Sequence, residues 1–236
     1  MPKTDHFLIT CEHGGNRIPS SYRYLFTGFE TLLKTHRGYD AGALALARDL
    51  ARELNAPLFA STTSRLLVDL NRSIGHPCLY SEATRSEPVS VRGKILEKHY
   101  HPYRNQIEAE IAESVAGGSR VVHVAAHSFT PEIDGAVRTA DIGLLYDPAR
   151  SGEVELCRRW QAQLKAWAPH LKSRRNYPYA GKSDGLTATL RRRFPAENYV
   201  GIELEINQKH IVNGERHWRA FRSGVIEALR QAISQR

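Results

Sequence analysis

Two histidines follow apolar runs that have the character of buried strands. Residues 7–11 form one such run and lead into Glu12 and His13, and residues 120–126 form another that ends at His127. The carboxyl ends of neighbouring parallel strands meet at one edge of a sheet, where α/β proteins bind ligands. Imidazole is the commonest metal ligand in proteins, and a catalytic zinc site takes about three protein ligands and keeps one position open. The two histidines therefore predict a metal site at that edge.

The third metal ligand has three candidates, and the sequence alone leaves them open. Asp40 stands where a long helix is predicted to begin, so its carboxylate either binds the metal or caps the helix. Asn16 lies in the loop after His13, but an amide is a poor zinc ligand, and this one can equally well hold the turn. His36 fits better at the surface or as a support for the ligands.

A late apolar run, residues 199–206, contains two carboxylates that suggest a catalytic base. Glu203 and Glu205 are two positions apart, so in a strand their side chains share one face. Carboxylates are costly to bury among Val, Ile and Leu unless they are paired or bind a metal. Glu205 lies nearer the carboxyl end and is the better placed to remove a proton from a metal-activated water.

Arginines near the predicted strand ends suit a substrate that carries a carboxylate. Arg65 and Arg72 lie at the two ends of the apolar run at residues 65–70, and Arg138 precedes the run at residues 141–146. The guanidinium fork binds a carboxylate through two parallel hydrogen bonds. For Arg72 an internal ion pair with Asp69 explains the residue equally well.

Polar groups in two further segments are candidates for the same site. Ser128 places a hydroxyl group directly beside His127, and Tyr177 and Tyr179 belong to a loop that could close over a bound substrate. None of them is specific by itself, so their value depends on the rest of the pattern.

The elements that position these residues alternate between strands and helices. This order predicts an α/β fold with a mostly parallel, mixed sheet and helices on both faces. No linker, repeat or low-complexity segment interrupts it, so residues 1–236 are predicted to form a single domain. Strands are predicted at residues 7–11, 58–61, 65–70, 120–127, 141–146 and 199–206, helices at 40–54, 94–115, 152–168 and 217–234, and a helical or irregular piece at 21–34.

Composition narrows the compartment and the partners. The three cysteines are far apart and form no CxxC pair, which argues against a disulfide framework and a thiolate zinc site and favours the cytoplasm. No apolar run approaches the roughly 18 residues of a membrane helix, and no signal peptide is evident. The net charge is +8, but the basic residues are scattered. A small anionic substrate therefore explains the charge better than nucleic acid does. The oligomeric state is not specified.

Taken together, these segments resemble the N-formylglutamate amidohydrolase family. The matching pieces occur in the family's order and extend over nearly the whole chain. They are residues 12–19 (EHGGNRIP), 36–43 (HRGYDAGA), 64–72 (SRLLVDLNR), 127–131 (HSFTP), 141–143 (DIG), 176–179 (NYPY) and 205–208 (EINQ). The resemblance implies a fold similar to that of zinc carboxypeptidases and aspartoacylases, with zinc or another divalent metal as cofactor.

The resemblance also implies roles for individual residues. His13 and His127 would bind the metal, and Glu205 would be the catalytic base. Relatives carry the metal acid at the position of Asn16, so we expect Asp40 to have taken over that role, with Asn16 as second choice. Residues expected to bind the substrate are Arg65, Asn71, Arg72, Arg138 and Tyr179, and residues expected to support the site are Glu12, which would orient His13, and Ser128.

The expected activity is hydrolysis of N-formyl-L-glutamate or a similar N-acyl amino acid, which would fit a role in histidine degradation. Family members commonly have an arginine and an aspartate where this chain has Asn207 and Lys209, so the difference bears on the substrate. Two alternatives remain: a metallopeptidase or amidase acting on a larger peptide, and a non-catalytic protein of the same fold that binds anions or nucleic acid.

Overall fold

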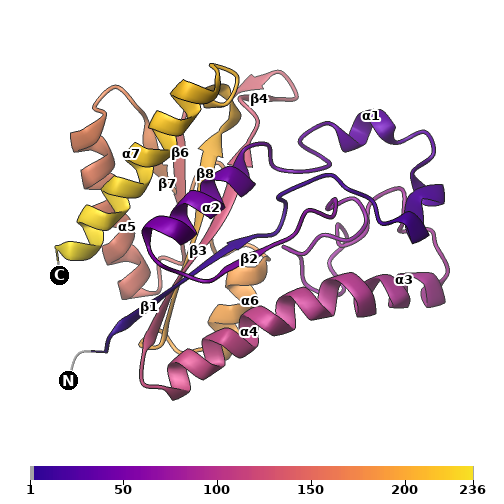
Figure 1. Cartoon of the computed structure of the whole chain (residues 1–236), viewed down its shortest axis with the longest axis horizontal. Coiled ribbons are helices and arrows are strands. Elements are labelled where there is room, and N and C mark those ends of the chain that lie inside the picture. The colour runs from indigo at the N-terminus through magenta and orange to yellow at the C-terminus, as the bar shows by residue number, and fades with distance from the viewer. Residues whose placement is uncertain (1–2, 236) are drawn as a thin grey trace.

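A six-stranded mixed sheet runs through the computed structural model, which describes residues 3–235 (Figure 1). The strand order is β2-β1-β3-β8-β6-β7. The first four strands in this order are parallel, β6 is antiparallel to β8, and β7 is parallel to β6. The strands are β1 (Asp5–Cys11), β2 (Leu58–Ala60), β3 (Arg120–Phe129), β6 (Ile142–Leu145), β7 (Ser173–Arg175) and β8 (Tyr199–Asn207), and a separate hairpin joins β4 (Glu132–Ile133) to β5 (Ala136–Val137).

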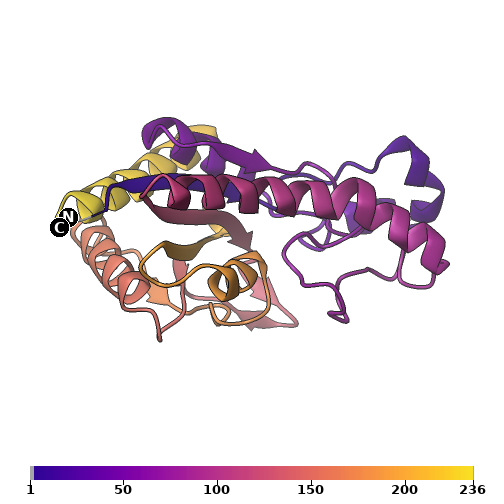
Figure 2. The same ribbon diagram turned by 90° about the horizontal axis from the view of Figure 1, so that it is seen from below.

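Helices cover both faces of this sheet, as the alternation of elements predicts (Figures 1 and 2). On one face lie α2 (Ala43–Glu53), α5 (Ser151–Trp167) and α7 (Glu215–Ser234), and on the other lie α4 (His101–Ala116) and α6 (Leu186–Arg193). The single-domain α/β class and the mixed sheet are confirmed. The remaining helical elements are η1 (Ser20–Phe26), α1 (Glu30–Leu33), α3 (Val89–Ile95), η2 (Leu96–Tyr100) and η3 (Gln208–His210).

Side-chain alternation along the strands divides the interior into two hydrophobic cores. Ile9 in β1 packs toward α2, α5 and α7, whereas its neighbour Leu8 packs toward α4 and α6. In β8 the alternate residues Ile202 and Leu204 belong to the first core. Glu203 and Glu205 therefore face the other way, toward the side of α6 and the site described below.

The predicted strand at residues 65–70 is wrong. This segment consists of turns, although Leu66 and Leu67 are buried in the second core. The Oγ atom of Ser64 accepts a hydrogen bond from the backbone of Leu66, and the carboxylate of Asp69 accepts one from the backbone of Asn71. These local bonds stabilise turns in a sequence whose apolar run suggests a strand.

The first long helix begins at Ala43, not at Asp40. Gly42 precedes it with a φ of +77°, and a Cβ atom there would lie 2.6 Å from Cδ1 of Ile211. The left-handed conformation and the close approach both require glycine. Asp40 consequently lies ahead of the helix and does not cap it, which leaves its side chain for another role.

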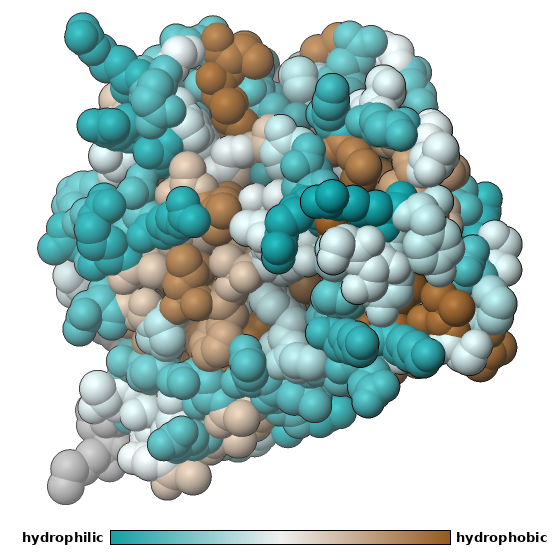
Figure 3. Space-filling view, turned by 45° about the vertical axis from the view of Figure 1, so that its right-hand side comes forward, coloured by the Kyte–Doolittle hydropathy of each residue, from teal (hydrophilic) through white to brown (hydrophobic). Residues whose placement is uncertain are grey.

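Figure 3 shows hydrophilic residues over most of one face, with smaller hydrophobic patches between them. Within residues 3–235, every helix is too short or too polar to cross a membrane.

Candidate active site

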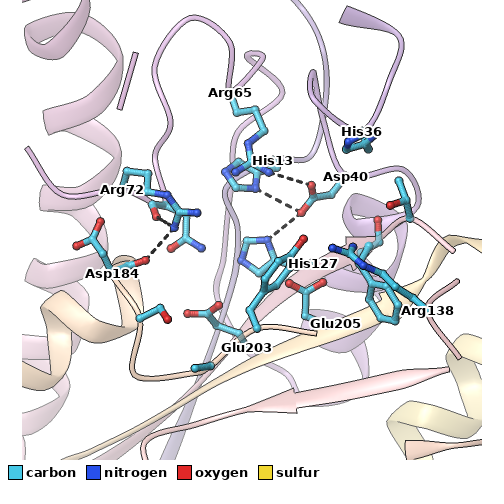
Figure 4. A pocket seen from close by; sticks show the side chains of 17 residues that line it. His13, His36, Asp40, Arg65, Arg72, His127, Arg138, Asp184, Glu203 and Glu205 are labelled. Atoms are coloured by element: carbon cyan, nitrogen blue, oxygen red, sulfur yellow. Dashed lines mark hydrogen bonds and ion pairs between the residues drawn. The ribbon is translucent and has the colours of Figure 1, made fainter. Parts of the chain in front are cut away.

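His13 and His127 lie side by side, with their ring centroids 5.2 Å apart. His127 is in β3, and His13 follows the end of β1, which is its parallel neighbour. Figure 4 shows both rings next to the carboxylate of Asp40. The Nδ1 atoms of His13 and His127 lie 3.3 and 2.9 Å from Oδ2 of Asp40. All three residues are buried, so one carboxylate oxygen and two ring nitrogens converge on a single point.

The opposite nitrogen of each ring lies beside a further carboxylate. The Nε2 atom of His13 lies 2.7 Å from Oδ1 of Asp69, and that of His127 lies 3.0 Å from Oε2 of Glu12. The expectation that Glu12 orients His13 is wrong. Glu12 contacts His127 instead, because its side chain points toward the neighbouring strand β3. The hydroxyl group of Tyr103 donates a hydrogen bond to Oε1 of Glu12 at 3.0 Å. A carboxylate beside each Nε2 orients the ring and turns its Nδ1 atom toward Asp40.

The arrangement fits a divalent cation. The three ligand atoms of His13, Asp40 and His127 lie within 4.8 Å of one another. Two imidazoles and a carboxylate make a donor set that zinc commonly accepts. Asn16 lies outside this group, since its side-chain amide donates to the backbone carbonyl of Leu33.

The electrostatic environment keeps these acids ionised. Burial by itself raises the pKa of Glu12, but the close contact with His127 and the charge of its ring outweigh burial and bring the value to about 2. The pKa values of Asp40 and Asp69 are also lowered against the effect of burial, by His13 and His127 for Asp40 and by Arg65 and His13 for Asp69. The cluster is therefore rich in negative charge, which favours a bound cation.

Glu205 lies beside this cluster, and its side chain forms no hydrogen bond or ion pair within residues 3–235. It pairs in register with His127 across β3 and β8. Its Oε2 atom is buried without a hydrogen-bond partner. Burial raises the pKa of Glu205 to about 8; the charge of His127 opposes the rise, and those of Asp40 and Glu203 add to it. Glu203, in contrast, accepts a hydrogen bond of 2.6 Å from the hydroxyl group of Thr187. Of the two glutamates, Glu205 is the one available for proton transfer.

These groups open into a cavity of about 270 Å³. The exposed His36 lies at its rim, beyond Asp40, and is not part of the cluster (Figure 4). The other lining residues are His13, Asp40, Arg65, Asn71, Arg72, His127, Ser128, Phe129, Thr130, Arg138, Tyr179, Ala180, Ser183, Asp184, Glu203 and Glu205.

The arginines in the cavity differ in their partners. Arg65 donates to Asp69, with Nη2 2.6 Å from Oδ2. Arg72 does not pair with Asp69: its Nη1 atom donates to the backbone carbonyls of Asn71 and Asp184. The Nε atom of Arg72 is buried without a partner. Arg65 thus completes the support of His13, whereas Arg72 retains capacity to bind a ligand.

Asn71 and Ser128 both line the cavity and are anchored to backbone groups. The Oδ1 atom of Asn71 accepts a bond from the backbone of Leu186, which leaves its amide nitrogen as a donor. Ser128 donates to the carbonyl of Ala41 at 2.6 Å and thereby ties β3 to the segment that carries Asp40. Its hydroxyl group also accepts a bond from Gln208.

Tyr179, and not Tyr177, reaches the cavity. The guanidinium of Arg138 lies 5.3 Å from the ring centroid of Tyr179 and 5.8 Å from that of Phe129. Tyr177 instead packs edge-on against Phe129 from outside the lining. The structure therefore decides between two tyrosines that the sequence leaves equivalent.

Asp69 and Tyr103 are site residues that the sequence did not assign. From the sequence, Asp69 is predicted only as a possible ion-pair partner of Arg72. Its position inside an apolar run could have indicated a functional carboxylate, since an acid is costly to bury there. Tyr103 lies in α4, about 90 positions away from Glu12, with no local sign of its role. Only the packing of α4 on the sheet brings it to the site.

Buried histidines and carboxylates at the strand ends of an α/β sheet, beside a small polar cavity, define a hydrolase-type site. The N-formylglutamate amidohydrolase family model matches residues 5–212. The chain belongs to this family of amide hydrolases, which confirms the resemblance found in the sequence. No curated protein matched the chain.

Solved structures share the fold of this chain. The crystal structure of gene product Atu2144 from Agrobacterium tumefaciens is 30% identical, covers 98% of this chain and 92% of its own, and has a TM-score of 0.84. An N-formylglutamate amidohydrolase from Ralstonia eutropha JMP134 is 17% identical, with 99% and 96% covered and a TM-score of 0.71. An N-acetylmuramoyl-L-alanine amidase from Clostridium difficile 630 is 12% identical, with 99% of both chains covered and a TM-score of 0.50. The last two share the fold.

Proposed function

We propose that this protein is a metal-dependent amidohydrolase that cleaves small N-acyl amino acids, with N-formyl-L-glutamate as the first substrate to test and zinc as the first metal. One observation carries the proposal: the Nδ1 atoms of His13 and His127 converge on one oxygen of Asp40 while carboxylates hold both Nε2 atoms. This arrangement prepares three ligands before any cation arrives.

His13, Asp40 and His127 would hold the metal. A divalent cation there would polarise the acyl carbonyl and lower the pKa of a nearby water. With a cation bound, Asp69 and Glu12 would hold the proton of each imidazole on Nε2, which leaves Nδ1 to bind the metal. Arg65 neutralises part of the charge of Asp69 and so limits repulsion between the carboxylates.

Glu205 would act as the general base. Its unpartnered Oε2 atom accepts a proton from the attacking water and then delivers it to the nitrogen of the leaving amine. The positive charge of a cation at the neighbouring ligands would lower the raised pKa of Glu205 and favour the ionised form that accepts the proton. Thr187 keeps Glu203 in place beside it.

Substrate binding would use the arginines that line the cavity. The free edge of Arg72, with Asn71 next to it, suits the carboxylate of an amino acid. A cavity of about 270 Å³ that contains three arginines favours a small acid over the extended peptide of a cell-wall amidase or peptidase. Hydrolysis of N-formyl-L-glutamate would place the protein in histidine degradation in the cytoplasm.

A substrate screen with and without metal tests the proposal. Protein stripped with a chelator and protein reloaded with zinc are incubated with N-formyl, N-acetyl and longer N-acyl amino acids, and the released amine is measured. We expect zinc-dependent release and one bound zinc per chain, with stoichiometric zinc lost in His127→Ala. Turnover by metal-free protein, or full zinc occupancy of His127→Ala, would contradict the assigned ligand set.

A further inference from the structure

Two guanidinium groups in the cavity lack a carboxylate partner in the described part of the chain. Arg65 is paired, since it lies 2.6 Å from Asp69 and 3.5 Å from Asp40. Arg72 and Arg138 line the same cavity but form no ion pair within residues 3–235. Both are half-buried. A half-buried charge that forms no ion pair is stabilised when a ligand neutralises it, so the cavity suits a ligand with two negative groups.

Arg72 is oriented before a ligand binds. Its Nη1 atom is fixed by the carbonyls of Asn71 and Asp184 at 3.1 and 2.8 Å. The buried Nε atom has no partner. The Nε and Nη2 edge is one of the two edges through which a guanidinium binds a carboxylate in bidentate fashion. This edge is therefore the available one.

Arg138 is oriented by a different device. Its guanidinium stacks against the rings of Tyr179 and Phe129. Its backbone carbonyl accepts a hydrogen bond of 3.1 Å from the buried side chain of Asn207, and its backbone nitrogen donates to Pro131. Stacking occupies the faces of a guanidinium and leaves its edge N–H groups free to donate.

The two arginines lie on opposite sides of the proposed metal ligands. Figure 4 shows Arg72 on one side of His13 and His127 and Arg138 on the other. A single loop of the cavity wall contacts both arginines at different points. Tyr179 packs on Arg138, and five residues later the carbonyl of Asp184 accepts a hydrogen bond from Arg72. An amide positioned at the cluster would thus extend toward a cation in both directions.

Building on the proposed function, we infer that the preferred substrate carries a carboxylate on each side of the amide. Arg72 binds the carboxylate of the amino acid, and Arg138 binds an acid at the end of the acyl chain. Hydrolysis consumes one water and breaks the amide C–N bond. The acyl carbon forms a new bond to the water oxygen, the leaving nitrogen takes a proton from that water, and the products are a dicarboxylic acid and an amino acid. N-formyl-L-glutamate, whose two carboxylates are both on the amine side, is the competing arrangement.

Matched substrates separate the two arrangements. N-succinyl-L-alanine and N-succinamoyl-L-alanine differ only in whether the acyl chain ends in an acid or an amide, and N-formyl-L-glutamate and N-formyl-L-glutamine differ in the same way on the amine side. Values of kcat/KM are measured for zinc-loaded wild type, Arg138→Gln and Arg72→Gln. Arg174→Gln is the control, because Arg174 also stacks on a tyrosine, at 5.0 Å from the ring of Tyr177, but lies outside the cavity.

We expect wild type to prefer the succinyl over the succinamoyl substrate at least tenfold, and Arg138→Gln to abolish that preference. Arg72→Gln should lower kcat/KM for the succinyl and the succinamoyl substrate by the same factor, and Arg174→Gln should behave as wild type. The inference is overturned if Arg138→Gln removes a preference for formylglutamate over formylglutamine instead, or if no acid preference exists. Should no N-acyl amino acid be cleaved, the proposed function fails; calorimetric binding of glutarate that weakens in both arginine variants would still support the two-anion site, and equal binding to all variants would refute it.

Discussion

Asp69→Asn tests whether the negative charge of Asp69 is needed for His13 to bind a metal. The carboxylate of Asp69 contacts Nε2 of His13 at 2.7 Å, the guanidinium of Arg65 at 2.6 Å and the backbone nitrogen of Asn71 at 2.9 Å. Asparagine has nearly the same shape and can still accept two of these bonds through its oxygen. Its NH₂ group would then face Arg65, and the negative charge that polarises the imidazole would be lost.

The magnitude follows from these contacts. Loss of a carboxylate behind a metal-binding histidine typically weakens metal affinity about 10–100-fold, or about 1.4–2.7 kcal/mol. Breaking a fully buried ion pair costs about 3–5 kcal/mol, and exposed pairs are worth less than about 1 kcal/mol. Arg65 has a side chain that is 25% exposed and still lies 3.5 Å from Asp40. We therefore expect the free energy of unfolding without metal to fall by an intermediate amount, about 1–3 kcal/mol.

Zinc competition with a chromophoric chelator measures the affinity, and urea unfolding of metal-free protein measures the stability. Glu82→Gln is the matched control, since it also removes a carboxylate paired with an arginine, Arg37, but away from the ligand cluster. A folded Asp69→Asn protein that binds zinc within twofold of wild type would refute the assigned role. A loss of stability without a loss of zinc affinity would show that Asp69 serves only to pair Arg65.

Three further predictions use other parts of the structure. Glu205→Gln should retain zinc and lower kcat about 10²–10⁴-fold, whereas the same loss in Glu203→Gln with normal turnover in Glu205→Gln would move the base to Glu203. Arg72→Gln should raise KM for an N-acyl amino acid about 10–100-fold with little change in Tm; an unfolded variant would assign Arg72 a structural role. Asp141→Asn should lower Tm at neutral pH, because Lys209, the backbone of Lys172 and His210 outweigh burial and lower the pKa of Asp141. This stabilisation is present above the unfolded-state pKa of about 3.9 and is lost as the pH falls through the folded value, so the variant should show a shallower decrease in Tm below about pH 4 in calorimetry.

Much of the fold could be predicted because its signals are local. Buried parallel strands appear as short apolar runs, and the helices between them contain strong helix formers, so their order is visible along the chain. The segment at residues 65–70 failed for a related reason: its apolar side chains are buried, as in a strand, but side-chain bonds from Ser64 and Asp69 stabilise turns. Burial alone does not distinguish the two.

The sequence by itself determined that His13, His127 and Glu205 stand at or near the ends of buried strands, since residue type, apolar pattern and order are all written along the chain. Only the tertiary structure decided what surrounds them. Gly42 delays the helix and leaves Asp40 free to face both histidines. The pairing of strands also assigns Glu12 to His127, and the turn at Asp69 assigns that carboxylate to His13. Arg72 donates to backbone carbonyls of Asn71 and Asp184 in place of an ion pair. These are contacts between segments up to about 115 positions apart, and such distances are fixed by packing, which no local pattern encodes.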